Sequence, residues 1–138
     1  MRTFDSDVAN ALFERAAELA FNSVMVTRAE DDGTSPIVFV NDAFTEMTGY
    51  TADEVLGETP GFLQGAETDE QVLQRLDAKM QRGEDFHGET VNYKKDGTPF
   101  IIEWKVSPVK NAAGEITHYV SVQRDVTALR EADVPADA

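Results

Sequence analysis

The chain has no cysteine, and this absence removes several kinds of chemistry. Without a thiol there is no disulfide, no thiolate nucleophile and no cysteine-based structural zinc site. Long apolar runs are also missing, since no stretch approaches the roughly 20 residues that a membrane-spanning helix requires. The acidic residues 1–7 carry no basic segment followed by an apolar one, as a secretory leader would. We therefore expect a cytoplasmic protein that does not bind membranes.

Positive charge is scarce as well. The 12 lysines and arginines stand against 26 aspartates and glutamates, which gives a formal net charge of -14 and a field that repels phosphates. We expect no nucleic-acid partner. The carboxylates are not accompanied by a nucleophile, a base and a phosphate loop, and the two histidines, His87 and His118, have no metal-ligand spacing around them. We expect neither an enzyme site nor a metal site.

The first half of the chain predicts an amphipathic helix, two short strands and three further helices. Pairs with capping-box spacing, Thr51 with Glu54 and Thr68 with Gln71, indicate two of the helix starts. The apolar stripe of the first helix comprises Val8, Leu12, Ala16 and Leu19. The expected elements are a helix over residues 5–21, strands over 23–27 and 37–40, and helices over 42–48, 51–56 and 68–82.

The second half predicts an antiparallel meander. Turn residues at 94–97 and 111–114 separate β-rich runs over residues 86–93, 100–107 and 116–126. The fold class expected from this order is α+β. A five-stranded antiparallel sheet would carry short helices and one longer helix on one face, in addition to the N-terminal amphipathic helix.

Several exact strings resemble motifs of the PAS domain family. They are residues 40–44 with 48–50, residues 92–97 and residues 123–127. The loop Gly-Glu-Thr-Pro-Gly-Phe-Leu-Gln-Gly at 57–65 is similar to the signature of the light-oxygen-voltage (LOV) subfamily, with Pro60 where that subfamily keeps its photoreactive cysteine. The resemblance implies a helical N-terminal cap over residues 1–21, a PAS/LOV-like domain over 22–127 and a C-terminal connector stub over 128–138. Residues 133–138 are expected to be disordered.

The LOV resemblance implies a flavin site built around amide side chains. Gln64, Asn92 and Gln123 fall at the positions that surround the flavin in that subfamily. Amides suit the ring edge chemically, because they offer both a donor and an acceptor without burying a charge. A second interpretation stays open, since amides beside turns and at strand ends are commonly solvated.

The same resemblance assigns the rest of the pocket wall. The further cofactor-binding candidates are Val24, Val26, Thr59, Leu63, Leu73, Leu76, Met80, Ile102, Trp104, Val106, Tyr119 and Ser121. The apolar members of this set would equally form a packed core, because an apolar pocket and a protein interior use the same residue types. Trp104, Tyr93 and Tyr119 are candidate electron donors to an excited flavin.

Departures from the subfamily concentrate on polar contacts. Thr59 and Ile102 replace asparagines, while Gly61 and Asp77 replace the two arginines that grip the flavin phosphate. A phosphate prefers charge-assisted donors, so Asp77 adds repulsion where the subfamily has attraction. FMN is the cofactor that the resemblance implies first, with FAD and riboflavin as alternatives.

Two hypotheses of function follow. The first is a flavin-binding photoreceptor or redox sensor that forms no cysteinyl adduct and signals by photoreduction or redox change. The alternative is a flavin-free PAS module for dimerisation or small-ligand binding. In either case the N-terminal helix and the strand row Ile116, His118, Val120 and Val122 offer an apolar face for a homodimer. The downstream signalling partner is not identifiable from the sequence.

Overall fold

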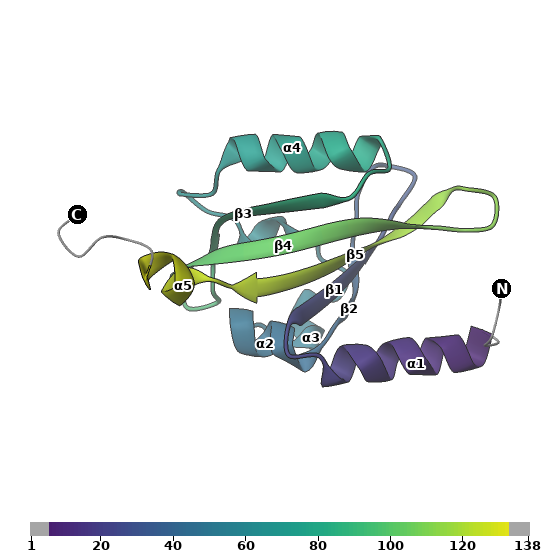
Figure 1. Ribbon diagram of the computed structural model, residues 1–138, viewed down its shortest axis with the longest axis horizontal. Helices are drawn as coiled ribbons and strands as arrows, with labels where there is room; N and C mark the ends of the chain where they lie inside the picture. The colour runs from purple at the N-terminus through teal and green to yellow at the C-terminus, as the bar shows by residue number, and fades with distance from the viewer. Residues whose placement is uncertain (1–5, 133–138) are drawn as a thin grey trace.

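Five antiparallel strands form one sheet in the order β2-β1-β5-β4-β3 (Figure 1). The structure is a computed structural model and describes residues 6–132. Its strands are β1 (Ser23–Arg28), β2 (Ile37–Val40), β3 (Phe86–Tyr93), β4 (Pro99–Lys110) and β5 (Ile116–Asp125). Short turns join β3, β4 and β5 into the expected meander, and β5 closes the sheet by pairing with β1.

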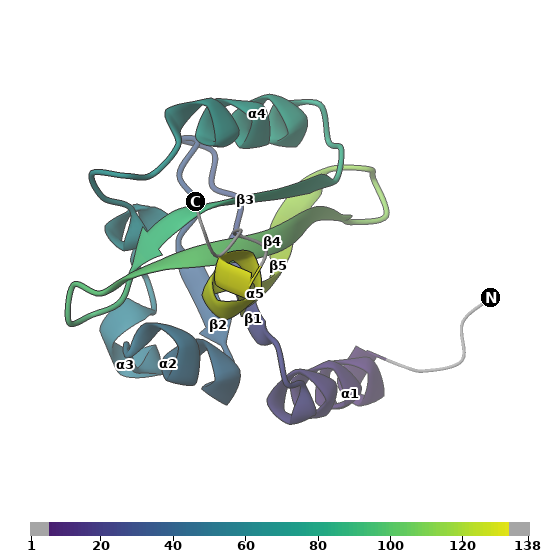
Figure 2. The same cartoon turned by 60° about the vertical axis from the view of Figure 1, so that its left-hand side comes forward.

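The helices divide between the two faces of the sheet (Figure 2). They are α1 (Ser6–Leu19), α2 (Asp42–Thr48), α3 (Ala52–Val55), the 3-10 helix η1 (Pro60–Leu63), α4 (Glu70–Gln81) and α5 (Thr127–Ala132). The helices α2, α3, η1 and α4 pack on one face, whereas α1 lies against the other and α5 follows the last strand. The predicted α+β fold, with its five-stranded antiparallel sheet, is confirmed.

Two apolar clusters hold the helices to the inner face. One joins α2, α3 and η1 to the first strands and consists of Met25, Ile37, Phe44, Val55 and Leu63. The other joins α4 to the meander and consists of Met47, Phe86, Phe100, Ile102, Trp104 and Val106. Alternate residues of β4 are buried in this second cluster, as the period-2 pattern predicts. The two clusters leave the space between α4, η1 and the middle strands for the site described below.

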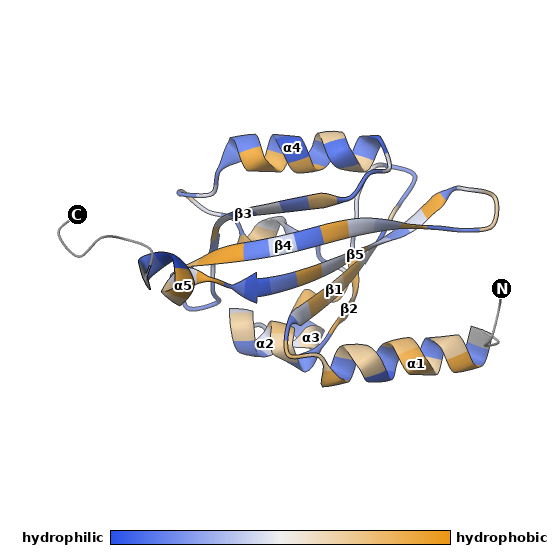
Figure 3. Ribbon diagram, in the orientation of Figure 1, coloured by the Kyte–Doolittle hydropathy of each residue, from blue (hydrophilic) through white to orange (hydrophobic). Residues whose placement is uncertain are grey.

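Helix α1 covers only part of the outer face. The Phe13 ring packs edge-on against Phe39 of β2, with 5.5 Å between the ring centroids. Ala17 of the same helix is buried. Figure 3 shows apolar and polar residues mixed around α1, and Leu12 and Leu19 stay exposed. None of the helices within residues 6–132 combines the length and the apolar character needed to cross a membrane.

One local prediction is wrong, and one short helix was not predicted. Thr68 does not cap the long helix, because Asp69 is its N-cap and accepts from the Gln71 backbone N–H at 2.9 Å. The Thr68 hydroxyl instead donates to the Val91 carbonyl at 2.6 Å. No sequence pattern indicated η1, which spans only four residues. The stub residues 133–138, expected to be disordered, and residues 1–5 lie outside the described part of the chain.

Candidate functional site

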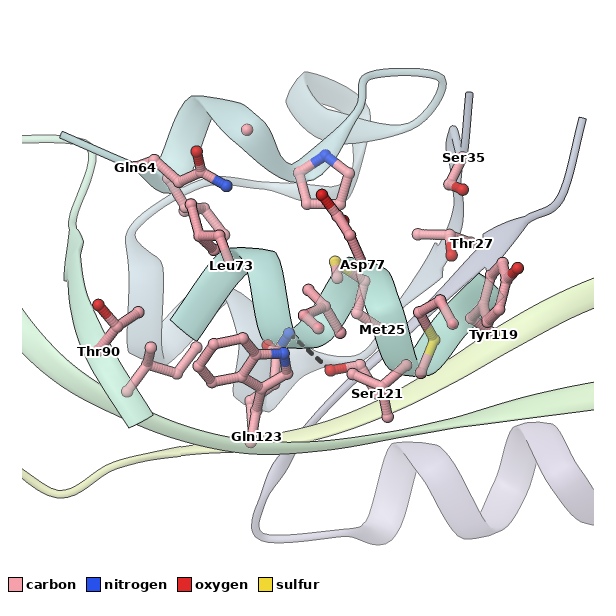
Figure 4. A pocket seen from close by; sticks show the side chains of 18 of the residues that line it. Met25, Thr27, Ser35, Gln64, Leu73, Asp77, Thr90, Tyr119, Ser121 and Gln123 are labelled. Atoms are coloured by element: carbon pink, nitrogen blue, oxygen red, sulfur yellow. Dashed lines mark hydrogen bonds between the residues drawn. The ribbon is translucent and has the colours of Figure 1, made fainter. Parts of the chain in front are cut away.

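A cavity of about 620 Å³ lies between the inner face of the sheet, η1 and α4 (Figure 4). Its size falls within the range of roughly 300 to 1,000 Å³ that is typical of small-molecule sites. The sheet supplies most of the polar groups, while both the sheet and the helices supply apolar ones. The cavity therefore has the mixed lining expected for a ligand with one polar edge and apolar faces.

Most of the residues predicted as site residues line this cavity. They are Leu63, Gln64, Leu73, Leu76, Met80, Asn92, Ile102, Trp104, Val106, Tyr119, Ser121 and Gln123, together with Pro60 at the lost cysteine position. The three strands of the meander bring their inward residues into one row, since β3 pairs with β4 and β4 with β5 in register. The structure thus gathers predicted side chains that are up to 63 positions apart in the sequence, from Pro60 to Gln123.

Three predicted residues do not line the cavity. Val24 and Val26 are buried, but strand alternation places their side chains on the face opposite to Met25 and Thr27, which do line it. Thr59 precedes η1 as its N-cap and is likewise absent from the lining. These three stay predictions as cofactor contacts, without support from the placement of their side chains.

The cavity also uses residues that were not predicted as ligand contacts. These are Met25, Thr27, Gly33, Ser35, Gly61, Asp77, Gln81 and Thr90. Strand β1 is buried on both faces, so its sequence gives no alternation from which the inward residues could be found. Thr90 was available from the alternation of β3, where it shares a face with Asn92.

The two buried amides differ in how they are held. Gln123 is 3% exposed; its Oε1 accepts from the Ser23 hydroxyl at 2.9 Å and its Nε2 donates to Ser121 Oγ at 3.0 Å. Asn92 is 8% exposed, yet its side chain makes no hydrogen bond with another residue of the described chain, and none of its polar atoms is fully enclosed. Its donor and acceptor are therefore free to meet a ligand in the cavity.

Gln64 completes the amide set from the opposite side. It follows η1, its side chain is exposed, and Figure 4 shows it across the cavity from Gln123. The adjoining Gly65 packs tightly under Tyr93, because a Cβ atom there would lie 2.3 Å from the tyrosine ring. The Tyr93 hydroxyl accepts the Glu67 N–H at 2.9 Å and thereby holds the loop that contains Gly65. Tyr93 does not line the cavity, whereas Trp104 and Tyr119 do.

A chain of polar contacts connects Gln123 to the N-terminal helix. Ser23 bonds Gln123 and follows Asn22, whose carbonyl accepts from Asn41 Nδ2 at 3.0 Å. The same Asn41 amide nitrogen donates to the Ala17 carbonyl of α1 at 2.7 Å. Asn41 is buried and also accepts the Val24 N–H, so its position is fixed. A change at Gln123 therefore has a short route to the end of α1.

Charged groups gather instead on the outer face of the sheet. Glu103 accepts from Arg124 Nε at 2.7 Å and lies 2.8 Å from His87 Nε2. The His87 hydrogen bond, followed by that of Arg124, holds the pKa of Glu103 below its ordinary value. The pKa of Glu89 is likewise lowered, chiefly by the hydrogen bond from Arg130 of α5. The Glu89–Arg130 pair fastens α5 to the sheet, and neither group of charges lines the cavity.

Comparison with known proteins places the chain in a family. The chain belongs to the PAS domain family, since the family model described as PAS domain matches residues 22–128. It is 39% identical over 117 residues to a blue-light-activated histidine kinase of Brucella anthropi, covering 83% of this chain. It is 34% identical over 117 residues to phototropin-1A of Oryza sativa subsp. japonica, covering 85% of this chain.

Solved structures agree with these relatives. An RNA-binding light-oxygen-voltage receptor is similar with a TM-score of 0.84 and 34% identity, over 94% of this chain and 36% of that one. A light-oxygen-voltage domain studied with a flavin analogue is similar with a TM-score of 0.74 and 28% identity, over 94% and 95% of the two chains. This protein is thus a PAS domain with LOV homologues, and it lacks the cysteine.

The relatives are much longer than the matched segment. The chain spans 23% of the histidine kinase and 13% of the phototropin. Kinase activity and RNA binding are therefore properties of those proteins. For this chain, the absence of an enzyme site and of a nucleic-acid partner stay predictions, the second resting on its net charge of -14.

Proposed function

We propose that this chain is a flavin-binding sensory domain that responds to blue light or to redox state without a covalent flavin adduct. The observation that carries the proposal is the unpartnered amide of Asn92, buried in a cavity that Gln64 and Gln123 also line. The donor and the acceptor of this amide open onto the cavity and are not used by the described chain, so a ligand with a matching donor and acceptor edge can bond both. The isoalloxazine ring of a flavin has such an edge and apolar faces.

The absence of a thiol sets the type of signal. Pro60 lines the cavity where the subfamily has its cysteine, and no other residue in the chain supplies a thiol. A bound flavin would supply light absorption and electron uptake. Trp104 and Tyr119 line the cavity and are the aromatic side chains placed to give up an electron there. Tyr93, the third candidate donor, is held outside the cavity by the loop around Gly65.

Gln123 is the residue that we propose as the reporter of the change. An amide presents a donor at one end and an acceptor at the other, so a half-turn exchanges what Gln123 offers to Ser23, Ser121 and the cavity. Ser23 would lose its acceptor in the rotated state. The contacts of Asn41 with Asn22 and Ala17 would carry that loss toward α1.

The experiment is illumination of the purified protein after incubation with a flavin. We expect blue light with an external reductant to bleach the flavin band reversibly, and denaturation after illumination to release an unmodified flavin. A protein that takes up neither riboflavin, FMN nor FAD would refute the proposal. The alternative of a flavin-free interaction module, suggested by the apolar Ile102 and by the missing phosphate-binding arginines, would then be favoured.

We also propose that two copies associate through the outer face. Apolar side chains are exposed on α1 and on the strands beside it, at Val8, Leu12, Phe13, Val109 and Val122. Strand register brings Val122 next to Val24, and Val120 next to Val26, so the exposed residues border a buried apolar area. An exposed apolar patch of this kind can form the shared surface of a two-fold homodimer.

A further inference from the structure

Within residues 6–132, the lining of the cavity includes a single carboxylate and no basic side chain. Of the described residues that line it, Asp77 is the one with a formal charge, and arginine, lysine and histidine are absent from the lining. Asp77 comes from α4 and is exposed, and Figure 4 shows its carboxylate pointing away from the sheet residues Ser121 and Gln123. A ligand bound there meets a negative charge and no compensating positive one.

The basic residues close to Asp77 are engaged elsewhere. Arg75 stacks 5.0 Å from the centroid of the Phe86 ring and donates to the His87 carbonyl at 3.1 Å, on the β3 side of α4. Lys79 lies 3.6 Å from the Glu84 carboxylate, and Arg82 pairs with the same carboxylate at 2.9 Å. None of these side chains reaches the lining.

The helix η1 adds no positive charge either. Gly61 lines the cavity from η1, at the position where the resemblance would put a phosphate-binding arginine. The loop between β1 and β2 brings further negative charge close by, because Asp32 lies one residue before the lining residue Gly33. Hydrogen bonds from the Thr34 hydroxyl and N–H hold the pKa of Asp32 below its usual value.

Neutral hydrogen-bonding groups are nevertheless plentiful. Thr27, Ser35, Gln81 and Thr90 line the cavity with hydroxyl and amide groups. Such groups bond the hydroxyls of a polyol chain well, whereas a phosphate dianion prefers charge-assisted donors. The lining therefore suits a flavin whose side chain is polar and uncharged.

We propose that the site takes riboflavin in preference to phosphorylated flavins, and that Asp77 is the residue that discriminates. This inference rests on the proposed flavin-binding function. A phosphate with about two negative charges, held within a Debye length of roughly 8 Å from the Asp77 carboxylate, is repelled enough to lower its affinity by about tenfold. FMN is the cofactor that the LOV resemblance implies, and the charges of the cavity argue against it.

The test is a titration of the flavin-free protein with riboflavin and with FMN at low ionic strength, followed by tryptophan or flavin fluorescence. We expect riboflavin to bind about tenfold more tightly, and the difference to shrink at molar salt because salt screens the repulsion. Equal or tighter FMN binding would overturn the inference and leave the proposed function intact. Binding of neither compound would refute the proposed function itself.

Variants of Asp77 show whether this residue is responsible. Asp77→Asn should narrow the difference between the two flavins, and Asp77→Arg should reverse it by giving the phosphate a cation. Asp53→Asn, an identical charge change at an exposed position of α3 outside the lining, is the matched control and should leave the difference unchanged. A difference that persists in Asp77→Asn would show that discrimination arises elsewhere and would overturn the role of Asp77.

Discussion

Replacing Asn92 with leucine separates ligand binding from protein stability. In the ligand-free protein the Asn92 amide makes no hydrogen bond with the described chain, so its removal sacrifices no internal contact. Leucine has a similar volume, and its apolar atoms would lie beside Phe100, the partner of Asn92 across the β3–β4 pair. Ile102, the partner of Thr90, is the next inward residue of β4. We expect the free energy of unfolding of Asn92→Leu to lie within about 1 kcal/mol of that of the unmodified protein.

Flavin affinity should change much more. An amide that gives two hydrogen bonds to the ring edge contributes roughly 0.5 to 1.5 kcal/mol for each, or about 1 to 3 kcal/mol together. The dissociation constant should therefore rise by roughly 5- to 150-fold. The assay pairs thermal unfolding of the flavin-free protein with a riboflavin titration of the same sample.

Two further variants sharpen this comparison. Gln123→Leu leaves the hydroxyls of Ser23 and Ser121, which are 2% and 4% exposed, without their amide partner. It should lower both flavin affinity and the stability of the flavin-free protein, by about 1 to 3 kcal/mol. Gln74→Leu changes an exposed amide of α4 outside the lining and should affect neither. An Asn92→Leu protein that binds flavin normally would refute the assignment of Asn92 to the site.

Three other outcomes follow from the packing and the charges. Gly65→Ala should lower the free energy of unfolding by about 1 to 3 kcal/mol, because the added Cβ atom would collide with Tyr93. Gly61→Ala is the control, since a Cβ atom there would have no neighbour within 4 Å. Equal melting temperatures of the two variants would contradict this prediction. The pKa of Glu103 is lowered, so its ionised form stabilises the fold above its ordinary pKa of 4.5, and this stabilisation is lost as the pH falls. The unmodified protein should therefore melt at a higher temperature than Glu103→Gln at neutral pH, and the difference in melting temperature should vanish on acidification. A difference that widens at low pH would contradict the direction of the shift. Leu12→Asp should convert a dimer to a monomer in light scattering, and a monomeric unmodified protein would refute the proposed interface.

Periodicity in the sequence was sufficient for most of the fold and for part of the site. Strands β3 and β4 alternate cleanly, because one face packs on α4 and the other faces solvent or charged pairs. Their inward residues, among them Ile102 and Trp104, could therefore be assigned to one face from the alternation alone. The amides at the end of β3 and on β5 could be named only through the family resemblance.

The remaining differences have local physical causes. Strand β1 is buried on both faces, so its sequence does not show that Met25 and Thr27 line the cavity, and Val24 and Val26 were assigned by the family resemblance. Thr68 has capping-box spacing with Gln71, but it is used to tie the loop to the Val91 carbonyl, and the adjacent Asp69 caps the helix. The Thr68 contact is not visible in the local sequence, because it depends on the distant strand β3.

Helical spacing already separates Arg75 and Lys79 from Asp77, because residues two positions apart on an α-helix lie about 200° apart around its axis. The structure adds their partners, Phe86 and Glu84, which hold both side chains away from the cavity.

The central claim is that the cavity holds a flavin without a covalent bond. The most direct measurement is the absorption spectrum of the protein after incubation with riboflavin and removal of the excess, followed by quantification of the flavin released on heating. The account predicts a flavin band in the blue and about one intact flavin released per chain, both before and after illumination. A colourless protein that releases none would contradict it.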